Sequence, residues 1–179
     1  GSGWSGGEIC VACHTPHNAS LVVTNAPLWN HATTSTVFTL YSSPTLDATV
    51  GQPDGTSKLC LSCHDGTVAL DSFGGATGST LMTGDELLGT TLANDHPVSI
   101  TYNTALATLD GALADPSTKT VTIGTGGQTK TGFVTNVMLR ADKVQCVSCH
   151  DVHNTFTNGA HLLVKSNSGS ALCLTCHVK

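Results

Sequence analysis

The eight cysteines of this 179-residue chain form four Cys-x-x-Cys pairs, and each pair is followed immediately by a histidine. Nine of the 179 residues are histidine, so the probability that chance places one after all four pairs is on the order of 10⁻⁵. Zinc ribbons, redox dithiols and disulfides also use paired cysteines, but none of them requires the histidine. The four motifs therefore constrain the chain more than any other feature of its sequence.

The spacing within each motif predicts covalent attachment of one haem. Two thiols one helical turn apart can bond the vinyl-derived carbons on one edge of the macrocycle, while the next residue brings its imidazole to the iron. The predicted attachment residues are Cys10, Cys13, Cys60, Cys63, Cys146, Cys149, Cys173 and Cys176. The predicted proximal iron ligands are His14, His64, His150 and His177. No cysteine is left over, so we expect four haem c groups.

The composition predicts an irregular fold whose core is supplied largely by the haems. Only 4% of the residues are aromatic and 11% are charged, while glycine, serine and threonine are abundant. We expect a single tetrahaem domain over residues 1–179, mostly coil and organised around a chain of haems. Short helices should form at the motifs and at 80–88, and strands 119–123 and 131–135 should form a hairpin around the glycine-rich turn 124–128. No tandem repeat beyond the haem motif itself is expected.

Charge and hydropathy exclude other classes of function. The net charge of −5 and the scattered basic residues argue against nucleic-acid binding. No apolar run approaches the roughly 18 to 20 residues that span a bilayer, so no transmembrane segment is expected. The opening residues Gly1–Trp4 lack the basic and apolar regions of an export signal, which predicts a mature, soluble chain. The four motifs resemble those of c-type cytochromes, and this resemblance implies haem attachment outside the cytoplasmic membrane, so a periplasmic or extracellular location is expected.

The second axial position of each iron decides between electron transfer and substrate chemistry. Five histidines lie outside the motifs, and four irons need four of them. Methionine is the other common ligand, but only Met82 and Met138 are present, and core packing accounts for both. We therefore predict four bis-histidine haems with no open position, which argues against an enzyme. A multihaem reductase would need a five-coordinate haem.

His17 and His153 each follow a proximal ligand by three residues. At helical spacing their Cβ atoms lie about 5–6 Å from those of the proximal histidines, on one side of the chain. The two axial ligands of one haem must approach from opposite faces, so neither histidine can serve the haem of its own motif. Each is predicted to ligate a different iron, and the alternative is a surface histidine in a loop.

The remaining distal candidates are His31, His96 and His161. The proline after His96 favours an extended backbone, which can place an imidazole against a haem face. His31 precedes the apolar segment 37–41, where the alternative to ligation is an ordinary packed histidine. Counting leaves one histidine unused, and we predict that it is His161.

In these motifs and histidines, the chain resembles the doubled-CxxCH multihaem cytochromes. Within that group it is most similar to the tetrahaem extracellular cytochrome filaments of metal-reducing bacteria, the OmcE-type nanowire subunits. The matching segments are Cys10–Ala19, Ala26–His31, Phe38–Ser43, Asn94–Val98 and Gly169–His177. They extend over nearly the whole chain, and the segments between the motifs carry the narrower resemblance because the motifs specify haem alone.

The resemblance implies a role in long-range electron conduction. In such filaments the haems run in alternating parallel-stacked and T-shaped pairs, and the second histidine of the first CxxCHxxH motif ligates a haem of the adjoining subunit. Carried over, that role falls on His17, and the partners are identical subunits, redox proteins or extracellular acceptors such as metal oxides. The family often lacks a histidine at the position of His161. The rival interpretation is a monomeric periplasmic shuttle with all four irons satisfied internally.

The motif count gives a first testable prediction. Because all eight cysteines lie in CxxCH motifs, the intact mass of the protein should equal the polypeptide plus four haems, with no thiol left to alkylate. A mass lacking even one haem would contradict the count.

Overall fold

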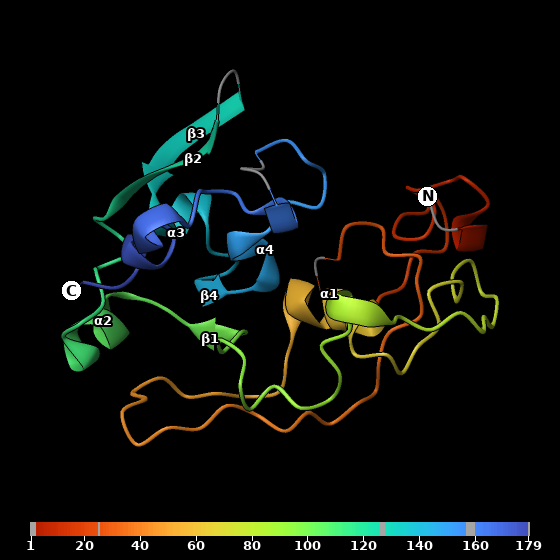
Figure 1. Cartoon of the computed structure of the whole chain (residues 1–179), viewed down its shortest axis with the longest axis horizontal. Coiled ribbons are helices and arrows are strands. Elements are labelled where there is room, and N and C mark those ends of the chain that lie inside the picture. The colour runs from red at the N-terminus through yellow and green to blue at the C-terminus, as the bar shows by residue number, and fades with distance from the viewer. Residues whose placement is uncertain (1–2, 25, 126–127, 157–159, 179) are drawn as a thin grey trace. The chain divides into compact units, whose positions relative to one another are not determined.

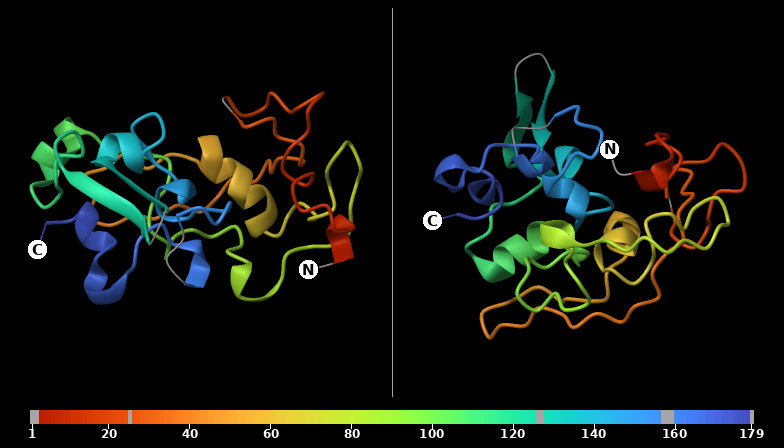
Figure 2. Two further views of the ribbon diagram at one scale, coloured as in Figure 1. Left: turned by 90° about the horizontal axis from the view of Figure 1, so that it is seen from above. Right: turned by 45° about the vertical axis from the view of Figure 1, so that its right-hand side comes forward.

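In the computed structural model, which describes residues 3–24, 26–125, 128–156 and 160–178, coil connects a few short helices and strands. Two further views show the same predominance of coil (Figure 2). The irregular fold predicted from composition is therefore confirmed. The predicted organisation around a chain of haems stays a prediction.

The chain forms two compact units, and each contains one pair of CxxCH motifs. Unit 1 comprises residues 1–41 and 52–96 and holds the first and second motifs. Unit 2 comprises residues 42–51 and 97–179 and holds the third and fourth motifs. Two compact units do not by themselves make two domains, so the single tetrahaem domain over 1–179 stays a prediction.

Unit 1 is built around one helix, α1 (Gly55–His64), in yellow-orange in Figure 1. The helix buries Ser57, Leu59, Leu61 and Ser62, and its last two turns contain the second motif. Leu59 packs with Val23 and Trp29, while Leu61 packs with Phe38 and Leu92. These two small clusters are the apolar core of the unit. The 3-10 turns at Gly3–Ser5 and Gly84–Glu86 complete its helical structure.

Unit 2 contains the sheet structure of the described residues. Two short antiparallel pairs form, β1 with β4 and β2 with β3. The strands are β1 (Ile100–Thr101), β2 (Thr120–Thr125), β3 (Gln128–Phe133) and β4 (Lys143–Val144). The helices are α2 (Thr104–Asp110), α3 (Val134–Val137) and α4 (Cys146–Cys149), with 3-10 turns at Ala160–Leu162, Ser168–Ser170 and Cys173–Thr175. The third motif begins with α4 and the fourth with the last 3-10 turn.

The core of unit 2 lies where α3 meets the β2–β3 hairpin (Figure 1). Val134 and Val137 of α3 are fully or almost fully buried beside Val121 and Ile123 of β2. Met138 is also 3% exposed in this cluster, as expected for a methionine used in packing. The unit therefore has a larger apolar core than unit 1.

The hairpin predicted from sequence is confirmed, with different strand ends. Thr120 pairs with Phe133 at one end and Thr125 with Gln128 at the other, and the hydroxyls of Thr122 and Thr131 lie 2.8 Å apart across the ladder. Residues 134–135, expected to continue the second strand, begin α3 instead. Val134, the first residue of this helix, is fully buried.

The predicted helix over 80–88 is wrong apart from the three-residue 3-10 turn Gly84–Glu86. Leu81, Leu87 and Leu88 are all exposed, so a helix here would have no buried face to stabilise it. Gly84 also has a φ of +81°, which lies outside the helical region. In the described part of the chain, no helix is long and apolar enough to cross a membrane.

The small cores generate a prediction about folding. With so few buried apolar side chains in unit 1, the haem-free polypeptide should bury too little area to offset its conformational entropy. Protein expressed without haem attachment should therefore be disordered, while the haem-loaded protein unfolds cooperatively. Circular dichroism during thermal unfolding tests both forms, and a cooperative transition in the haem-free protein would refute this expectation.

Candidate haem-attachment sites

Each CxxCH motif forms a single hydrogen-bonded turn. The histidine N–H donates to the carbonyl of the first cysteine over 2.9 Å in the first motif and 3.0 Å in the third and fourth. The second motif lies inside α1 and continues its helical geometry. The predicted short helices are therefore present at the second, third and fourth motifs, whereas the first motif forms a hydrogen-bonded turn outside any helix.

The residue before the second cysteine anchors each turn to the protein interior. It is small and at most 4% exposed in all four motifs, as Ala12, Ser62, Ser148 and Thr175. Ser62 Oγ donates to the Lys58 carbonyl over 2.8 Å, and Thr175 Oγ1 donates to the Ala171 carbonyl over 3.1 Å. The cysteines are exposed or half-buried instead. Each turn thus presents its thiols on the outer side, where a large planar group has room to bond.

The thiols have the properties needed for thioethers. All eight cysteines, each within the described residues, are free of disulfides. Burial raises the pKa of the second cysteine in every motif, to about 12 for Cys63 and about 11 for Cys176, and it raises the pKa of Cys13 and Cys149 as well. A raised pKa keeps a thiol protonated, whereas zinc binding requires thiolates. Across the described ranges, no three Cys, His, Asp or Glu side chains gather to hold a metal ion.

Backbone carbonyls orient the proximal histidines. The Nδ1 atoms of His14, His64 and His150 lie 2.5, 2.8 and 2.7 Å from the carbonyl oxygens of Pro27, Glu86 and His161, respectively. A carbonyl can only accept, so Nδ1 carries the proton and Nε2 keeps its lone pair. This is the tautomer that a metal-ligating histidine needs, and the outer hydrogen bond also fixes the plane of the ring.

His177 of the fourth motif is held through the backbone. It pairs with Leu113 in an antiparallel bridge, and the N–H of Val178 donates to the Ala112 carbonyl over 2.8 Å. The buried hydroxyl of Tyr102 reaches the same place and donates to the carbonyls of Ala114 and Cys176, at 2.5 and 3.3 Å. Burial, followed by the charge of Cys176, raises the pKa of Tyr102, so the hydroxyl keeps its proton.

The surroundings of the first motif are repeated at the third. Residues 27–30 and 161–164 run antiparallel beside the two motifs, and we call them the clasp segments. His14 bridges to Trp29, and His150 bridges to Leu163. Two backbone hydrogen bonds also correspond. Thr15 N donates to Leu28 O over 2.9 Å at the first motif, and Asp151 N donates to Leu162 O over 2.8 Å at the third. In the other pair, Asn30 N donates to Cys13 O and Val164 N donates to Cys149 O, both over 2.9 Å.

This repeat is not visible in the sequence, because its contacts are made by backbone atoms and do not require particular residue types. Pro27 matches His161 and Trp29 matches Leu163, so the clasp segments share little beyond a leucine. That leucine has a left-handed backbone in both copies, with φ of 52° at Leu28 and 55° at Leu162. The likeness is one of local backbone geometry around two motifs, and the expectation of no tandem repeat stays a prediction. The asparagine after His17 and after His153, also left-handed in both copies, was the available signal.

The distal candidates differ in burial. His31 is 2% exposed, with its Nε2 2.9 Å from the Ala69 carbonyl and 3.6 Å from the sulfur of Cys63. His17, His96, His153 and His161 are exposed. The structure thus brings His31 against the second motif. Its distal role and those of the exposed histidines stay predictions.

Large apolar side chains are exposed beside the motifs. Leu174 lies inside the fourth motif and Val178 directly after it, and Leu88 donates its N–H to the carbonyl of His64. Leu28 and Leu162 of the clasp segments are exposed in the same way. An apolar macrocycle attached at the motifs would have such side chains within its reach. The residues around the motifs therefore fit haem in both chemistry and surface.

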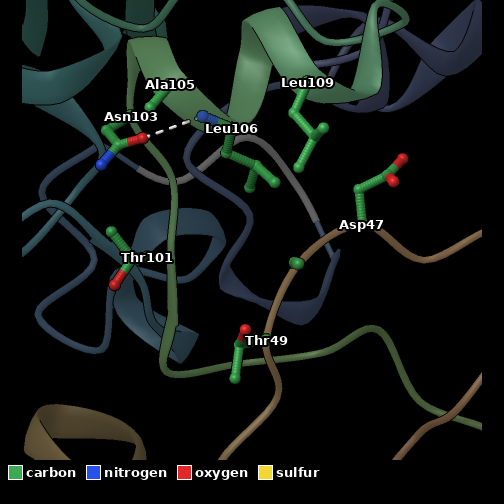
Figure 3. Close-up of a pocket in the computed structure, with 8 residues that line it drawn as sticks. Asp47, Thr49, Thr101, Asn103, Ala105, Leu106 and Leu109 are labelled. Atoms are coloured by element: carbon green, nitrogen blue, oxygen red, sulfur yellow. Dashed lines mark hydrogen bonds between the residues drawn. The ribbon is translucent and has the colours of Figure 1, made fainter.

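The cavity drawn in Figure 3 is not a haem site. It has a volume of about 340 Å³ and lies between α2 and the coil of residues 47–49, all within unit 2. None of the residues lining it is a cysteine or histidine. The amide oxygen of Asn103 accepts from Leu106 N and caps α2 there, so its polar group is already used in the fold.

Comparison with known proteins agrees with this site. The family described as "Doubled CXXCH motif" matches residues 139–179, which contain the third and fourth motifs. A search of curated proteins gives no match. The match covers the third and fourth motifs and supports covalent haem c binding there. It also supports, more coarsely, electron transfer by a doubled-CxxCH multihaem cytochrome.

Tyr102 gives a prediction for the fourth motif. In Tyr102→Phe the carbonyl of Cys176 loses one of its two hydrogen bonds, and we expect the free energy of unfolding to fall by about 1 kcal/mol. Chemical denaturation of the haem-loaded protein measures this change. Tyr41→Phe, at a half-buried coil position, is the matched control and should have little effect. Equal stability of the two variants would show that the hydroxyl does not hold the motif.

Proposed function

We propose that this protein transfers electrons through four covalently bound, bis-histidine haems and that it does so as a subunit of an extracellular cytochrome filament. The observation that best supports this proposal is a hydrogen bond made by three of the four proximal histidines. In each of them Nδ1 donates to a backbone carbonyl, which leaves Nε2 to bind iron. Bound haem iron supplies one-electron redox chemistry, and the polypeptide holds and orients its ligands.

Four haems follow from four equivalent turns. Each turn has a buried anchor residue, two outward thiols and a histidine directly after the second cysteine. The family match covers two of these turns, and the repeated clasp extends the likeness from the third motif to the first. Fixed ring planes favour rapid transfer, because ligands that barely move between oxidation states leave little to reorganise.

Occupation of both axial positions rests on the histidine count and on the placement of His161. The backbone carbonyl of His161 orients His150, and the matching residue in the first clasp segment is Pro27, which has no ligating side chain. At both positions it is therefore the backbone carbonyl, and not the side chain, that orients the proximal histidine. This supports His161 as the unused histidine and leaves His17, His31, His96 and His153 as distal ligands.

His31 would have to change its contacts to ligate iron. Its buried ring places both nitrogens on carbonyls, with Nδ1 2.7 Å from Ala32 O and Nε2 2.9 Å from Ala69 O. A neutral imidazole has one N–H and can satisfy one of these contacts. Retaining the Nδ1 contact while Nε2 leaves Ala69 would give the same tautomer as in the proximal histidines.

Assembly into a filament rests on His17. Its side chain is exposed, and Thr15 holds its backbone by donating Oγ1 to the His17 carbonyl over 2.7 Å. Its spacing from His14 denies it the haem of its own motif, so it is available to an iron outside the subunit. A bond of this kind would join assembly and conduction, since each new subunit brings its haem against that of its neighbour.

Replacing His17 with alanine tests the filament. We expect His17→Ala to retain four haems, to convert one of them to a high-spin or water-bound state, and to shorten or abolish filaments. Visible spectra and negative-stain electron microscopy report these changes. His161→Ala is the matched control and should leave both ligation and polymerisation intact.

The outcomes separate the two interpretations of the chain. Long filaments with four low-spin haems in the His17→Ala protein would exclude intersubunit ligation by His17. Discrete particles in the unaltered protein, with all four haems low-spin, would instead identify a monomeric periplasmic shuttle.

A further inference from the structure

A buried carboxylate lies directly after the proximal histidine of the second motif. The side chain of Asp65 is 3% exposed. Its Oδ2 accepts from Thr34 Oγ1 over 2.5 Å, and its Oδ1 accepts from the backbone N–H and the hydroxyl of Thr67, both over 2.8 Å. Three donors directed at one carboxylate are the arrangement that stabilises an ionised acid.

Within the described part of the chain, Asp65 forms no ion pair with a lysine or arginine. Lys58 is the sole lysine or arginine in the sequence of unit 1, against seven acidic residues: Glu8, Asp54, Asp65, Asp71, Asp85, Glu86 and Asp95. Unit 2 has six basic and five acidic residues. The negative charge is thus concentrated in the unit with the first two motifs, and Asp65 is its buried member.

Asp65 lies close to the attachment residues of the second motif. It follows His64 directly, and its backbone N–H donates to the Leu61 carbonyl over 2.9 Å. A hydrogen-bonded path also connects Asp65 with this motif, because Thr34 donates to Asp65 through its hydroxyl and to Ser62 Oγ through its backbone N–H, over 3.0 Å. Ser62 is the buried anchor residue of that motif.

We propose that Asp65 sets the redox potential of the haem at the second motif, by placing a fixed buried negative charge beside its attachment turn. The inference rests on the proposed function, since it requires haem at Cys60 and Cys63. Ferric haem carries one more positive charge than ferrous haem, so a nearby carboxylate favours the oxidised state and lowers the midpoint potential. A buried charge acts more strongly than a surface charge because water and salt screen it less.

The third motif shows what distinguishes Asp65. Asp151 follows His150 just as Asp65 follows His64, but Asp151 is half-buried and faces three backbone N–H groups of the next turn. Its role is to shape the loop after the motif. The two aspartates therefore occupy the same position relative to their motifs and differ in burial. The buried side chain, Asp65, is the one to which we assign an effect on the redox potential.

Asp65→Asn tests the proposal in the intact, haem-loaded protein. The amide keeps the shape, keeps Oδ1 as the acceptor for Thr67, and can donate to Thr34 in place of the lost acceptor. Potentiometric titration followed by visible absorption should show one of four redox steps moving to a higher potential, while the others move less. Asp65→Glu retains the charge and should restore the low potential.

Asp71→Asn is the matched control. It removes one negative charge from the same unit at a half-buried carboxylate and keeps Oδ1 to accept from Ser79 and Thr80. Its effect on potentials should be small at low salt and vanish at 1 M salt, where the Debye length is about 3 Å. The shift caused by Asp65→Asn should persist at 1 M salt.

The possible failures are distinguishable. Four unchanged potentials in an Asp65→Asn protein that carries four low-spin haems would overturn the tuning role and leave the proposed function intact. A shift no larger than that of Asp71→Asn would overturn it as well. If Asp65→Asn fails to mature, Asp65→Glu decides: a potential that rises despite the retained charge contradicts the proposal. Missing haem in the unaltered protein would overturn the proposed function itself.

Discussion

The hydrogen bond between a proximal histidine and a backbone carbonyl is the interaction on which three of the four sites depend. It fixes which ring nitrogen carries the proton and how the imidazole plane is oriented, and a histidine that ligates iron needs both to be defined. The accepting carbonyls belong to Pro27, Glu86 and His161, which lie 13, 22 and 11 residues from their histidines. The coil between the motifs therefore has a defined purpose.

This requirement explains how a chain with little regular structure presents repeated sites. The clasp segments need no helix or strand of any length, since one antiparallel bridge and a left-handed leucine bring the carbonyl to the ring. Small anchor residues such as Ser62 and Thr175 bury one side of each turn and leave the thiols outward. Apolar residues left exposed near the motifs, such as Leu174, become useful once a macrocycle is attached.

Sequence reasoning succeeded where side chains carry the signal and failed where the backbone does. The motifs and the hairpin of β2 and β3 follow from cysteine spacing and from the glycine-rich turn between Thr- and Val-rich segments. The clasp segments could not be predicted, because a carbonyl has no residue type and Pro27 and His161 serve equally well. The short turn at Gly84–Glu86 and the burial of Asp65 depend on tertiary packing, which local propensity does not determine.

The proposed electron-transfer function requires histidine on both faces of every haem iron. Electron paramagnetic resonance of the oxidised protein, as assembled, tests it most directly. The account predicts signals from low-spin ferric haem alone. A high-spin ferric signal of one haem per chain would reveal an open axial position and contradict the assignment of a pure electron-transfer protein.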